Sequence, residues 1–376
     1  MVSNGGALHK MVEALAKEPL VAVDTESNSL FAYREQVCLI QFSTPRADYL
    51  VDPLALSNLA PLAPIFANPA IEKVFHAAEY DLICLRRDFG FQFASLFDTM
   101  LAASILGRSE FGLGAMLESH FGVALDKRCQ RANWAERPLP AHLLSYAMLD
   151  THYLIPLREI LRQELQEKGL WGLAEEDFNR LQKINGRENE NGAGRCNENG
   201  PVDVFRVSGS YDLPPQKAAV LLELCRYRDQ AAQRLNRPLF KVLGDATLLA
   251  IASACPSSLA ELKKIKGMSE SQVRRHGGAV LEAVRRGSQA PPVLPPRSSR
   301  PDEAYLKRLE ALRQWRKTTA EGLGVKSDVV LPKDVMEAVA KGNPRSLTEL
   351  GELMEEVPWR LEQFGERMMM ALGYIV

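Results

Sequence analysis

The chain has 376 residues, a length that accommodates two or three domains, each with its own hydrophobic core. With 46% apolar and 25% charged residues, its composition is that of an ordinary globular protein. No stretch approaches the roughly 18 apolar residues of a membrane-spanning helix, and the first residues lack the layout of a secretory signal. We therefore expect a cytoplasmic protein that makes no contact with a membrane.

Charge is distributed unevenly along the chain, although the formal net charge is only −1. Residues 206–300 contain 16 Lys and Arg against 7 Asp and Glu, whereas the first 205 residues are acidic. This asymmetry favours a polyanion-binding segment joined to a domain that gathers carboxylates, although a basic stretch can also be a solvated helix face. The six cysteines form no C-x-x-C pair, so neither a disulfide framework nor a zinc ribbon is indicated.

The first 170 residues mix short strand patterns with helical ones. Three strands are predicted at 20–26, 37–43 and 47–52, and their short polar connections indicate an antiparallel meander. A fourth strand is predicted at 73–77. Helical patterns follow at 80–88, 99–106, 113–121 and from 140 to about 169. This order predicts an α/β fold in which helices cover a sheet.

Two breaks in composition divide the rest of the chain. Residues 171–210 are expected to form a linker, disordered around 185–200, where Asn, Gly, Glu and Arg dominate. A Pro-rich linker is expected at 291–300.

The segments on either side of the second break, 211–290 and 301–376, are related to each other. A shift of 88 positions aligns apolar helix positions and helix breakers, including the shared P-x-S-L-x-E-L at 256–262 and 344–350. A duplicated helical domain would retain such matches. We therefore predict two all-α modules of similar size.

Acidic side chains occur where the first strand ends. Asp24 and Glu26 stand at i and i+2, so both point to the same face of an extended backbone. Two adjacent carboxylates repel each other unless a cation lies between them. Taken alone, such a pair is more often a turn cap beside a solvated acid, so companions are needed.

Two later stretches supply possible companions. Asp81 stands in HAAEYDL (76–82), on the opening turn of a helix. Tyr146 and Asp150 stand at i and i+4 and therefore share a helix face. Each has an ordinary structural explanation by itself, but four acids and one phenol together indicate a site.

These motifs resemble the three exonuclease motifs of the DEDD superfamily, and the sequence is most similar to the ribonuclease D family. The likeness extends through VCLIQFS (37–43) and LDKRCQRANWAERPL (125–139), and the duplicated modules resemble the HRDC domain. The resemblance implies an RNase H-like mixed sheet flanked by helices over residues 1–170, followed by HRDC domains at 211–290 and 301–376.

The resemblance also implies that Asp24, Glu26, Asp81 and Asp150 hold two divalent cations, with Tyr146 beside the attacking water. Hard oxygen ligands without a His or Cys cluster suit Mg²⁺ or Mn²⁺. Two such ions, roughly 4 Å apart, would activate a water, orient the scissile phosphate and stabilise the departing 3′-oxygen.

The third motif sets the subclass. The sister subclass carries a histidine five residues before the last aspartate, where this chain has Ser145, so Tyr146 fits the tyrosine type. A phenol with a pKa near 10 is a poor base at neutral pH, so we expect it to orient the water. His152 follows Asp150 by two residues and is expected to pack or to face solvent.

Weaker predictions concern RNA contacts within the nuclease domain. His76 and Arg131 are candidates for contacting the terminal nucleotides, and Trp134 for stacking on them. Their alternatives are a capping histidine, a surface ion pair and a core aromatic. Residues 30–36 are a candidate wall against which the 3′-end would lie.

The first helical module carries a basic cluster around KKIKGMSESQVRR, where Gly267 with Met268 is expected to form a turn. Its predicted RNA-contacting residues are Lys263, Lys264, Lys266, Arg274 and Arg275. The equivalent part of the second module has lost most of this charge. We therefore expect the first module to anchor RNA, and the second to close a ring or to pack against the nuclease domain.

The resulting hypothesis is a monomeric, metal-dependent 3′-5′ exoribonuclease that acts on RNA with a free 3′ end, the family implying tRNA precursors and their 3′ trailers. Two alternatives remain open at this point. One is a DNA 3′-5′ exonuclease in repair, and the other is a non-catalytic RNA-binding protein that has lost the site.

Overall fold

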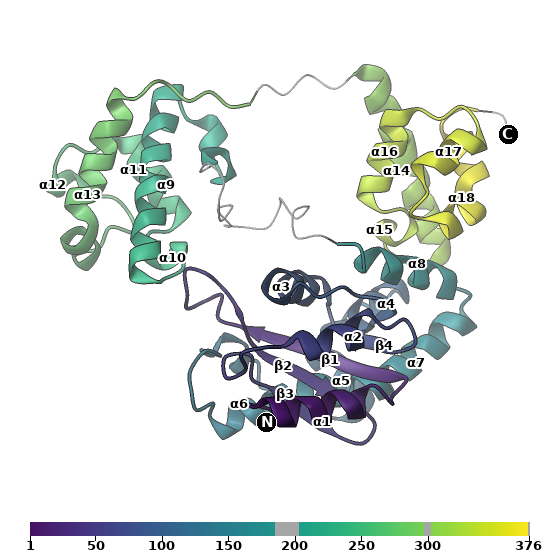
Figure 1. Ribbon diagram of the computed structural model, residues 1–376. Helices are drawn as coiled ribbons and strands as arrows, with labels where there is room; N and C mark the ends of the chain where they lie inside the picture. Colours follow the sequence, from purple (N-terminus) through teal and green to yellow (C-terminus); the bar gives the residue numbers. More distant parts are fainter. Residues whose placement is uncertain (185–202, 297–301, 375–376) are drawn as a thin grey trace. The chain divides into compact units, whose positions relative to one another are not determined.

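The computed structural model describes residues 1–184, 203–296 and 302–374 (Figure 1). The predicted disorder around 185–200 and part of the Pro-rich linker lie outside the described residues. Two compact units are present, and their described residues are 1–27, 37–184 and 302–374 in the first unit, and 28–36 and 203–296 in the second.

A five-stranded mixed sheet forms the centre of the first unit. Its strands are β1 (Leu20–Ser27), β2 (Val37–Ser43), β3 (Asp48–Val51), β4 (Glu72–Phe75) and β5 (Leu96–Asp98), in the spatial order β3-β2-β1-β4-β5. β1, β2 and β3 pair antiparallel, which confirms the predicted meander, whereas β4 and β5 continue the sheet in parallel from β1. β5 has only three residues, too few to show a period-two pattern in the sequence.

Helices cover the sheet (Figure 1). They are α1 (Gly5–Leu15), α2 (Ala63–Ala67), α3 (Glu79–Phe89), α4 (Thr99–Ile105), α5 (Leu113–Phe121), α6 (Ala141–His152), α7 (Leu154–Glu167) and α8 (Trp171–Leu181). Val21 and Val23 of β1 pack in the core that contains α1, α2 and α3. Ala22 packs in the opposite core, with α4, α5, α7 and α8. By strand periodicity, Asp24 and Glu26 leave β1 on the same side as Ala22.

The predicted long helix from 140 to about 169 is wrong, because the structure has two helices there. α6 ends at His152 and α7 begins at Leu154. Pro156 accounts for the break, since its ring would clash with the carbonyl of His152 in a continuous helix. As the third residue of α7, Pro156 occupies a position where no intrahelical N–H bond is required.

The predicted linker over 171–210 also needs a correction. Its first part, Trp171–Leu181, is the helix α8, which buries Leu173 and Phe178 in the core beneath β5. Polar and charged residues surround this apolar stripe of two helical turns, so the helix is weakly indicated by the sequence. Packing of the stripe against the sheet stabilises the helix.

The described residues of each helical module contain five α-helices in the same order. The first helical module (residues 203–296) has α9 (Pro215–Leu235), α10 (Leu239–Val242), α11 (Asp245–Ala254), α12 (Leu259–Leu262) and α13 (Glu270–Gln289). The second helical module (residues 302–374) has α14 (Glu303–Leu323), α15 (Ser327–Val330), α16 (Lys333–Gly342), α17 (Leu347–Leu353) and α18 (Pro358–Ala371).

Equivalent hydrogen bonds at a separation of 88 residues support the duplication. Arg228 donates from Nη1 to the carbonyl oxygen of Leu243 at 3.2 Å, and Arg316 donates in the same way to Leu331 at 2.9 Å. The predicted turn at Gly267 is present, with φ of 95°. The two modules therefore share internal contacts as well as an order of helices.

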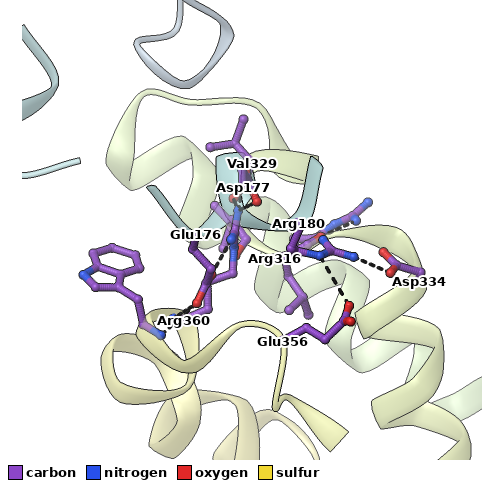
Figure 2. Close-up of polar contacts among 11 residues, drawn as sticks. Glu176, Asp177, Arg180, Arg316, Val329, Asp334, Glu356 and Arg360 are labelled. Carbon is purple, nitrogen blue, oxygen red and sulfur yellow. Dashed lines mark hydrogen bonds and ion pairs between the residues drawn. The ribbon is translucent and has the colours of Figure 1, made fainter. Parts of the chain in front are cut away.

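The modules differ at an equivalent position, occupied by the half-buried Gln272 in the first and the fully buried Arg360 in the second. Gln272 donates to the carbonyl oxygen of Val242 at 3.1 Å, and Arg360 donates to the equivalent carbonyl of Val330 at 3.2 Å. The guanidinium of Arg360 extends beyond this shared bond. It binds two acids of α8, as Figure 2 shows.

These two acids attach the second helical module to the helices that cover the sheet. Glu176 binds Arg360 and also accepts from the backbone N–H of Trp359 at 2.8 Å, while Asp177 binds Arg360 at 2.8 Å (Figure 2). The indole of Trp359 lies directly against Gly172, where any Cβ would collide with it. Packing of this module against the nuclease domain, one of the two expected placements, is therefore confirmed.

A helix that crosses a lipid bilayer must be both long and apolar. Within residues 1–184, 203–296 and 302–374, no helix combines the length and the apolar character needed to cross one.

Candidate active site

Three of the predicted acids meet where β1 approaches α6. Asp24 and Glu26 stand on β1 and Asp150 on α6, and each offers a carboxylate oxygen within 4.8 Å of the others. α6 packs against β1, β2 and β3, so Asp150 is delivered to the face of β1 that carries the other two. A bulge in the pairing of β1 with β2 follows Glu26 directly, which ends the regular ladder at the cluster.

Asp81 stands outside this group of three carboxylates and is linked to it through β1. It is buried on the first turn of α3, and the hydroxyl of Thr25 donates a hydrogen bond to its Oδ1. Thr25 alternates with Asp24 and Glu26 along the strand, so its side chain points toward α3 when theirs point toward α6. The middle residue of D-T-E thus links the fourth acid to the other three.

Gln41 contacts Asp24, a second interaction at the site that was not expected from the sequence. It is fully buried on β2, opposite Asp24 in the strand register, and its Nε2 donates to Asp24 Oδ2 at 3.5 Å. The sequence signal was a single amide within the apolar run VCLIQF, since a buried polar group needs a partner.

The electrostatics of the cluster are those of acids without a counter-charge. Burial, opposed by a backbone hydrogen bond, raises the pKa of Asp24 to about 7. Burial and then the neighbouring carboxylates raise the pKa of Glu26 to about 10, and burial with the charge of Asp24 raises that of Asp150 to about 9. The pKa of Asp81 also lies well above its ordinary value, through burial and the charge of Asp24. A bound cation would reverse these shifts.

The donors fit a hard divalent cation. Every candidate ligand in this cluster is a carboxylate oxygen, the kind that Mg²⁺ and Mn²⁺ prefer. Oδ1 of Asp150 is buried and, within the described part of the chain, has no hydrogen-bond partner. A buried carboxylate oxygen without a partner is costly, and coordination to a cation would satisfy it.

Tyr146 lies beside the acids on the same face of α6 as Asp150. Asp150 lies one helical turn away, and its carboxylate and the phenol influence each other's pKa. Burial, followed by the charges of Asp150, Glu26 and Asp24, raises the pKa of the phenol above its ordinary value. The hydroxyl therefore stays protonated and acts as a hydrogen-bond donor.

The expectation that Trp134 stacks on a nucleotide needs a correction. Its side chain is only 1% exposed and belongs to a core cluster with Leu139, Leu143 and Tyr146. Its ring lies 6.3 Å from that of Tyr146, centroid to centroid. Trp134 therefore packs beside Tyr146 and has no exposed face on which a nucleotide could stack. This agrees with the alternative that Trp134 is a core aromatic residue.

The other candidate contacts within the nuclease domain differ in exposure. Nδ1 of His76 lies 2.9 Å from Oγ1 of Thr99, and burial lowers the pKa of this half-buried histidine. Arg131 is exposed. His152 faces solvent, as expected, and pairs with Asp48 at 2.9 Å. Nucleotide contacts by His76 and Arg131 stay predictions.

The loop that follows the D-T-E strand belongs to the second compact unit. Within residues 28–36, the hydroxyl of Tyr33 donates to Asp229 at 2.7 Å, and its backbone N–H donates to Asn236 at 3.2 Å. Nζ of Lys241 lies 4.3 Å from the centre of the Phe31 ring. The segment predicted to form a wall is thus held by the first helical module.

With this geometry established, comparison with known proteins identifies the family. The 3′-5′ exonuclease family matches residues 1–166, and the HRDC domain matches residues 217–284 and 306–372. Ribonuclease D of Pseudomonas paraeruginosa is 31% identical over 363 residues, which cover 94% of this chain and 92% of that protein. The chain belongs to the ribonuclease D family.

A second relative and a solved structure agree with this membership. Escherichia coli ribonuclease D is 31% identical over 77% of this chain and 75% of its own length. The crystal structure of Escherichia coli RNase D, described as an exoribonuclease involved in structured RNA processing, matches with a TM-score of 0.70 at 28% identity. That match covers 99% of this chain and 98% of the solved one. The predicted fold and the two HRDC domains are confirmed, and the protein is a 3′-5′ exoribonuclease.

Proposed function

We propose that this 3′-5′ exoribonuclease uses two divalent cations, held by Asp24, Glu26, Asp81 and Asp150, and that its natural substrates are tRNA precursors with 3′ trailers. One observation supports the cation site above others: three carboxylates lie within 4.8 Å of one another, with raised pKa values and no cationic side chain among the causes of those shifts. The tRNA assignment rests on the family and on the description of the Escherichia coli enzyme as acting on structured RNA.

The side chains of the site have distinct roles in this proposal. When bound, the cations supply Lewis-acid stabilisation and an activated water at neutral pH. The four carboxylates ligate them and lose the protons that burial otherwise retains. Thr25 fixes the carboxylate of Asp81, and Gln41 fixes that of Asp24. Tyr146 keeps its proton and donates its hydroxyl to orient the attacking water, a role that its raised pKa favours over that of a base.

The test is digestion of a 3′-labelled ribo-oligomer with Mg²⁺, with Mn²⁺ and with EDTA. We expect stepwise shortening from the 3′ end with either metal and none with EDTA. Cleavage that continues unchanged with EDTA would contradict the cation-dependent mechanism. For variants of the active-site acids, the matched control is Glu355→Gln, at an exposed acid of the second HRDC domain. This control variant should cleave RNA at the full rate.

Two further comparisons test the substrate class. A matched deoxyribo-oligomer, digested in parallel, should be degraded more slowly, and equal or faster degradation would favour the DNA-repair alternative. A tRNA precursor with a short 3′ trailer should be trimmed to a defined end. Complete degradation of that precursor would argue against trailer processing.

We also propose that the first HRDC domain anchors RNA. Its basic residues Lys263, Lys264, Lys266, Arg274 and Arg275 are all exposed. At a separation of 88 residues the second HRDC domain carries Gly351, Glu352, Met354, Glu362 and Gln363 instead. Because phosphate binding depends on positive charge, these five positions suit it in the first domain and do not in the second.

Salt dependence measures this anchoring. Changing Lys263, Lys264 and Lys266 to Ala should weaken RNA binding and reduce the slope of log affinity against log salt by about 2, since each phosphate contact on single-stranded RNA contributes roughly 0.7. The control changes Lys317, Lys333 and Lys341, exposed lysines of the second HRDC domain, and should leave the slope unchanged. Equal effects of the two triple variants would contradict the assignment.

The remaining proposals concern organisation. We propose a nuclease domain over residues 1–170, extended by α8, followed by HRDC domains at 211–290 and 301–376. A monomer is expected and can be measured by light scattering during gel filtration. The cytoplasmic location stays a prediction, which microscopy of a tagged chain would test.

A further inference from the structure

The turn that delivers Asp81 is not stabilised by its own side chains. Between β4 and α3 the chain passes through Ala77, whose φ of 62° lies in the left-handed region that residues other than glycine rarely adopt. Ala78, the N-cap of α3, has no side chain that could cap the helix. Asp81 follows on the first turn of α3. Its position therefore depends on a contact from elsewhere in the fold.

Asp98 supplies that contact from the end of β5. Its side chain is only 3% exposed. Oδ1 accepts a hydrogen bond from the backbone N–H of Ala77 at 3.1 Å, and Oδ2 accepts one from that of Ala78 at 2.7 Å. A carboxylate that accepts from both residues holds the turn in its left-handed form and occupies the place of the missing cap.

The same carboxylate also caps α4. Oδ1 accepts from the backbone N–H groups of Met100 at 2.8 Å and Leu101 at 3.0 Å. Phe75 of β4 pairs with Asp98 in the parallel ladder, so the ends of β4 and β5 are adjacent. An ordinary N-cap serves only the helix that follows it. Here the second oxygen is directed to α3, the helix that carries Asp81.

From these contacts we infer that Asp98 is a positioning residue of the active site, which holds the Ala77–Ala78 turn so that Asp81 is placed for cation binding. Asp98 fixes the backbone of α3, and Thr25 fixes the carboxylate of Asp81. Asp81 is thus constrained at both ends by groups that are not ligands. The inference rests on the proposed role of Asp81 as a cation ligand.

The variant Asp98→Asn separates the two functions of this carboxylate. Asn is as good an N-cap as Asp, so its single oxygen can still cap α4. Its amide nitrogen then faces the N–H of Ala78, a donor against a donor. We therefore expect folding with α4 capped and Ala77 still bound, but with the N–H of Ala78 at the start of α3 released.

The readout is Mn²⁺ binding to the full-length protein, measured by calorimetry without RNA. Loss of a contact that orients a ligand typically costs about 10-fold to 100-fold in metal affinity, and we expect a decrease of that size for Asp98→Asn. Glu176→Gln, at a buried acid that binds Arg360, is the control for general destabilisation and should keep the wild-type Mn²⁺ affinity. An affinity within about twofold of wild type for Asp98→Asn would overturn the inference.

A rescue experiment distinguishes positioning from simple loss of a cap. Glycine adopts positive φ without strain, so adding Ala77→Gly to Asp98→Asn should restore part of the Mn²⁺ affinity. A merely structural role in capping α4 would not respond to this second change, and absence of rescue would count against the inference.

Asp81→Asn separates failure of the inference from failure of the proposed function. If Asp81→Asn and Asp98→Asn both bind Mn²⁺ as wild type does, the assignment of Asp81 as a ligand is wrong. If Asp81→Asn weakens binding and Asp98→Asn does not, only the positioning role of Asp98 is overturned.

Discussion

Two groups of buried acids in the same compact unit have opposite surroundings. Glu176 and Asp177 on α8 face the fully buried guanidinium of Arg360. Burial raises the pKa of both acids, and the guanidinium opposes that rise. The acids of the active site, among them Asp24 and Asp150, have no such partner among the causes of their pKa shifts: burial raises both pKa values, and the charge of Asp24 raises that of Asp150 further.

The difference separates a structural site from a functional one. Where the chain provides its own cation, the acids serve to attach the second HRDC domain to the nuclease domain. Where the chain provides none, the acids repel one another or retain protons, and the proposed cations would relieve this.

The largest effect is expected for Asp24→Asn. Loss of a ligand should decrease the rate of RNA cleavage by more than about 100-fold, beyond the usual range for residues that only orient ligands. The folded protein without metal should be no less stable than wild type, because a repelling charge has been removed. Cleavage assays and thermal unfolding in EDTA measure the two quantities. A near-normal rate would show that the site is assigned wrongly.

Arg360→Ala should have the opposite signature, with a large loss of stability. Removing one partner of a buried ion pair typically costs about 3–5 kcal/mol, because the other charges stay buried without compensation. Denaturant unfolding of the full chain measures this loss. Gln272→Ala, at the equivalent position of the first HRDC domain, removes a single hydrogen bond and should cost only about 1 kcal/mol. Similar losses for the two variants would contradict the special role of the guanidinium.

The pH dependence of stability in EDTA should report on the raised pKa values of the active-site acids. The folded-state pKa values of about 7 for Asp24 and about 9 for Asp150 exceed those of unfolded carboxyls, near 4. Between about pH 4 and pH 7 the folded state therefore binds more protons than the unfolded one. Its stability should fall as the pH rises, by up to about 1.4 kcal/mol per pH unit for each such proton.

The control for this measurement is the variant Asp24→Asn, which lacks one of the raised groups and should show a shallower fall with pH. Mn²⁺ should raise the thermal midpoint most at the alkaline end, where the ligands are already deprotonated. A wild-type protein and an Asp24→Asn variant with the same pH profile would show that the raised pKa values do not influence stability.

The smallest effect is expected for Tyr146→Phe. Loss of one orienting hydrogen bond of about 1.4 kcal/mol corresponds to a tenfold lower rate. The pH profile of the rate should keep its shape, since the phenol does not titrate near neutrality. A loss as large as that of Asp24→Asn, with a changed pH profile, would instead identify the phenol as the general base.

Local patterns in the sequence were sufficient to predict much of the site. The spacing of Asp24 and Glu26 on a strand, and of Tyr146 and Asp150 on a helix, follows from periods of 2 and 3.6 residues. These periods place each pair on one face before any tertiary contact is known. Pro156 also indicates the break after α6, although one long helix was expected there.

Other features depended on partners distant in the chain. Trp134 had equal reasons to be a stacking face or a core residue, and only the packing of Leu139, Leu143 and Tyr146 around it decided for the core. The polar stretch after residue 170 was interpreted as a linker because α8 is stabilised by β5 and by the second HRDC domain, not by its own propensity.

The sequence by itself determined which side chains share a face of a strand or helix, the duplication of the helical modules and the resemblance to ribonuclease D, because each of these is encoded by residues close together or by a repeat. Only the tertiary structure decided that Asp98 holds the turn before Asp81 and that Arg360 reaches Glu176. Such contacts join residues whose separation along the chain carries no information about distance, since they form only when the sheet and its helices pack.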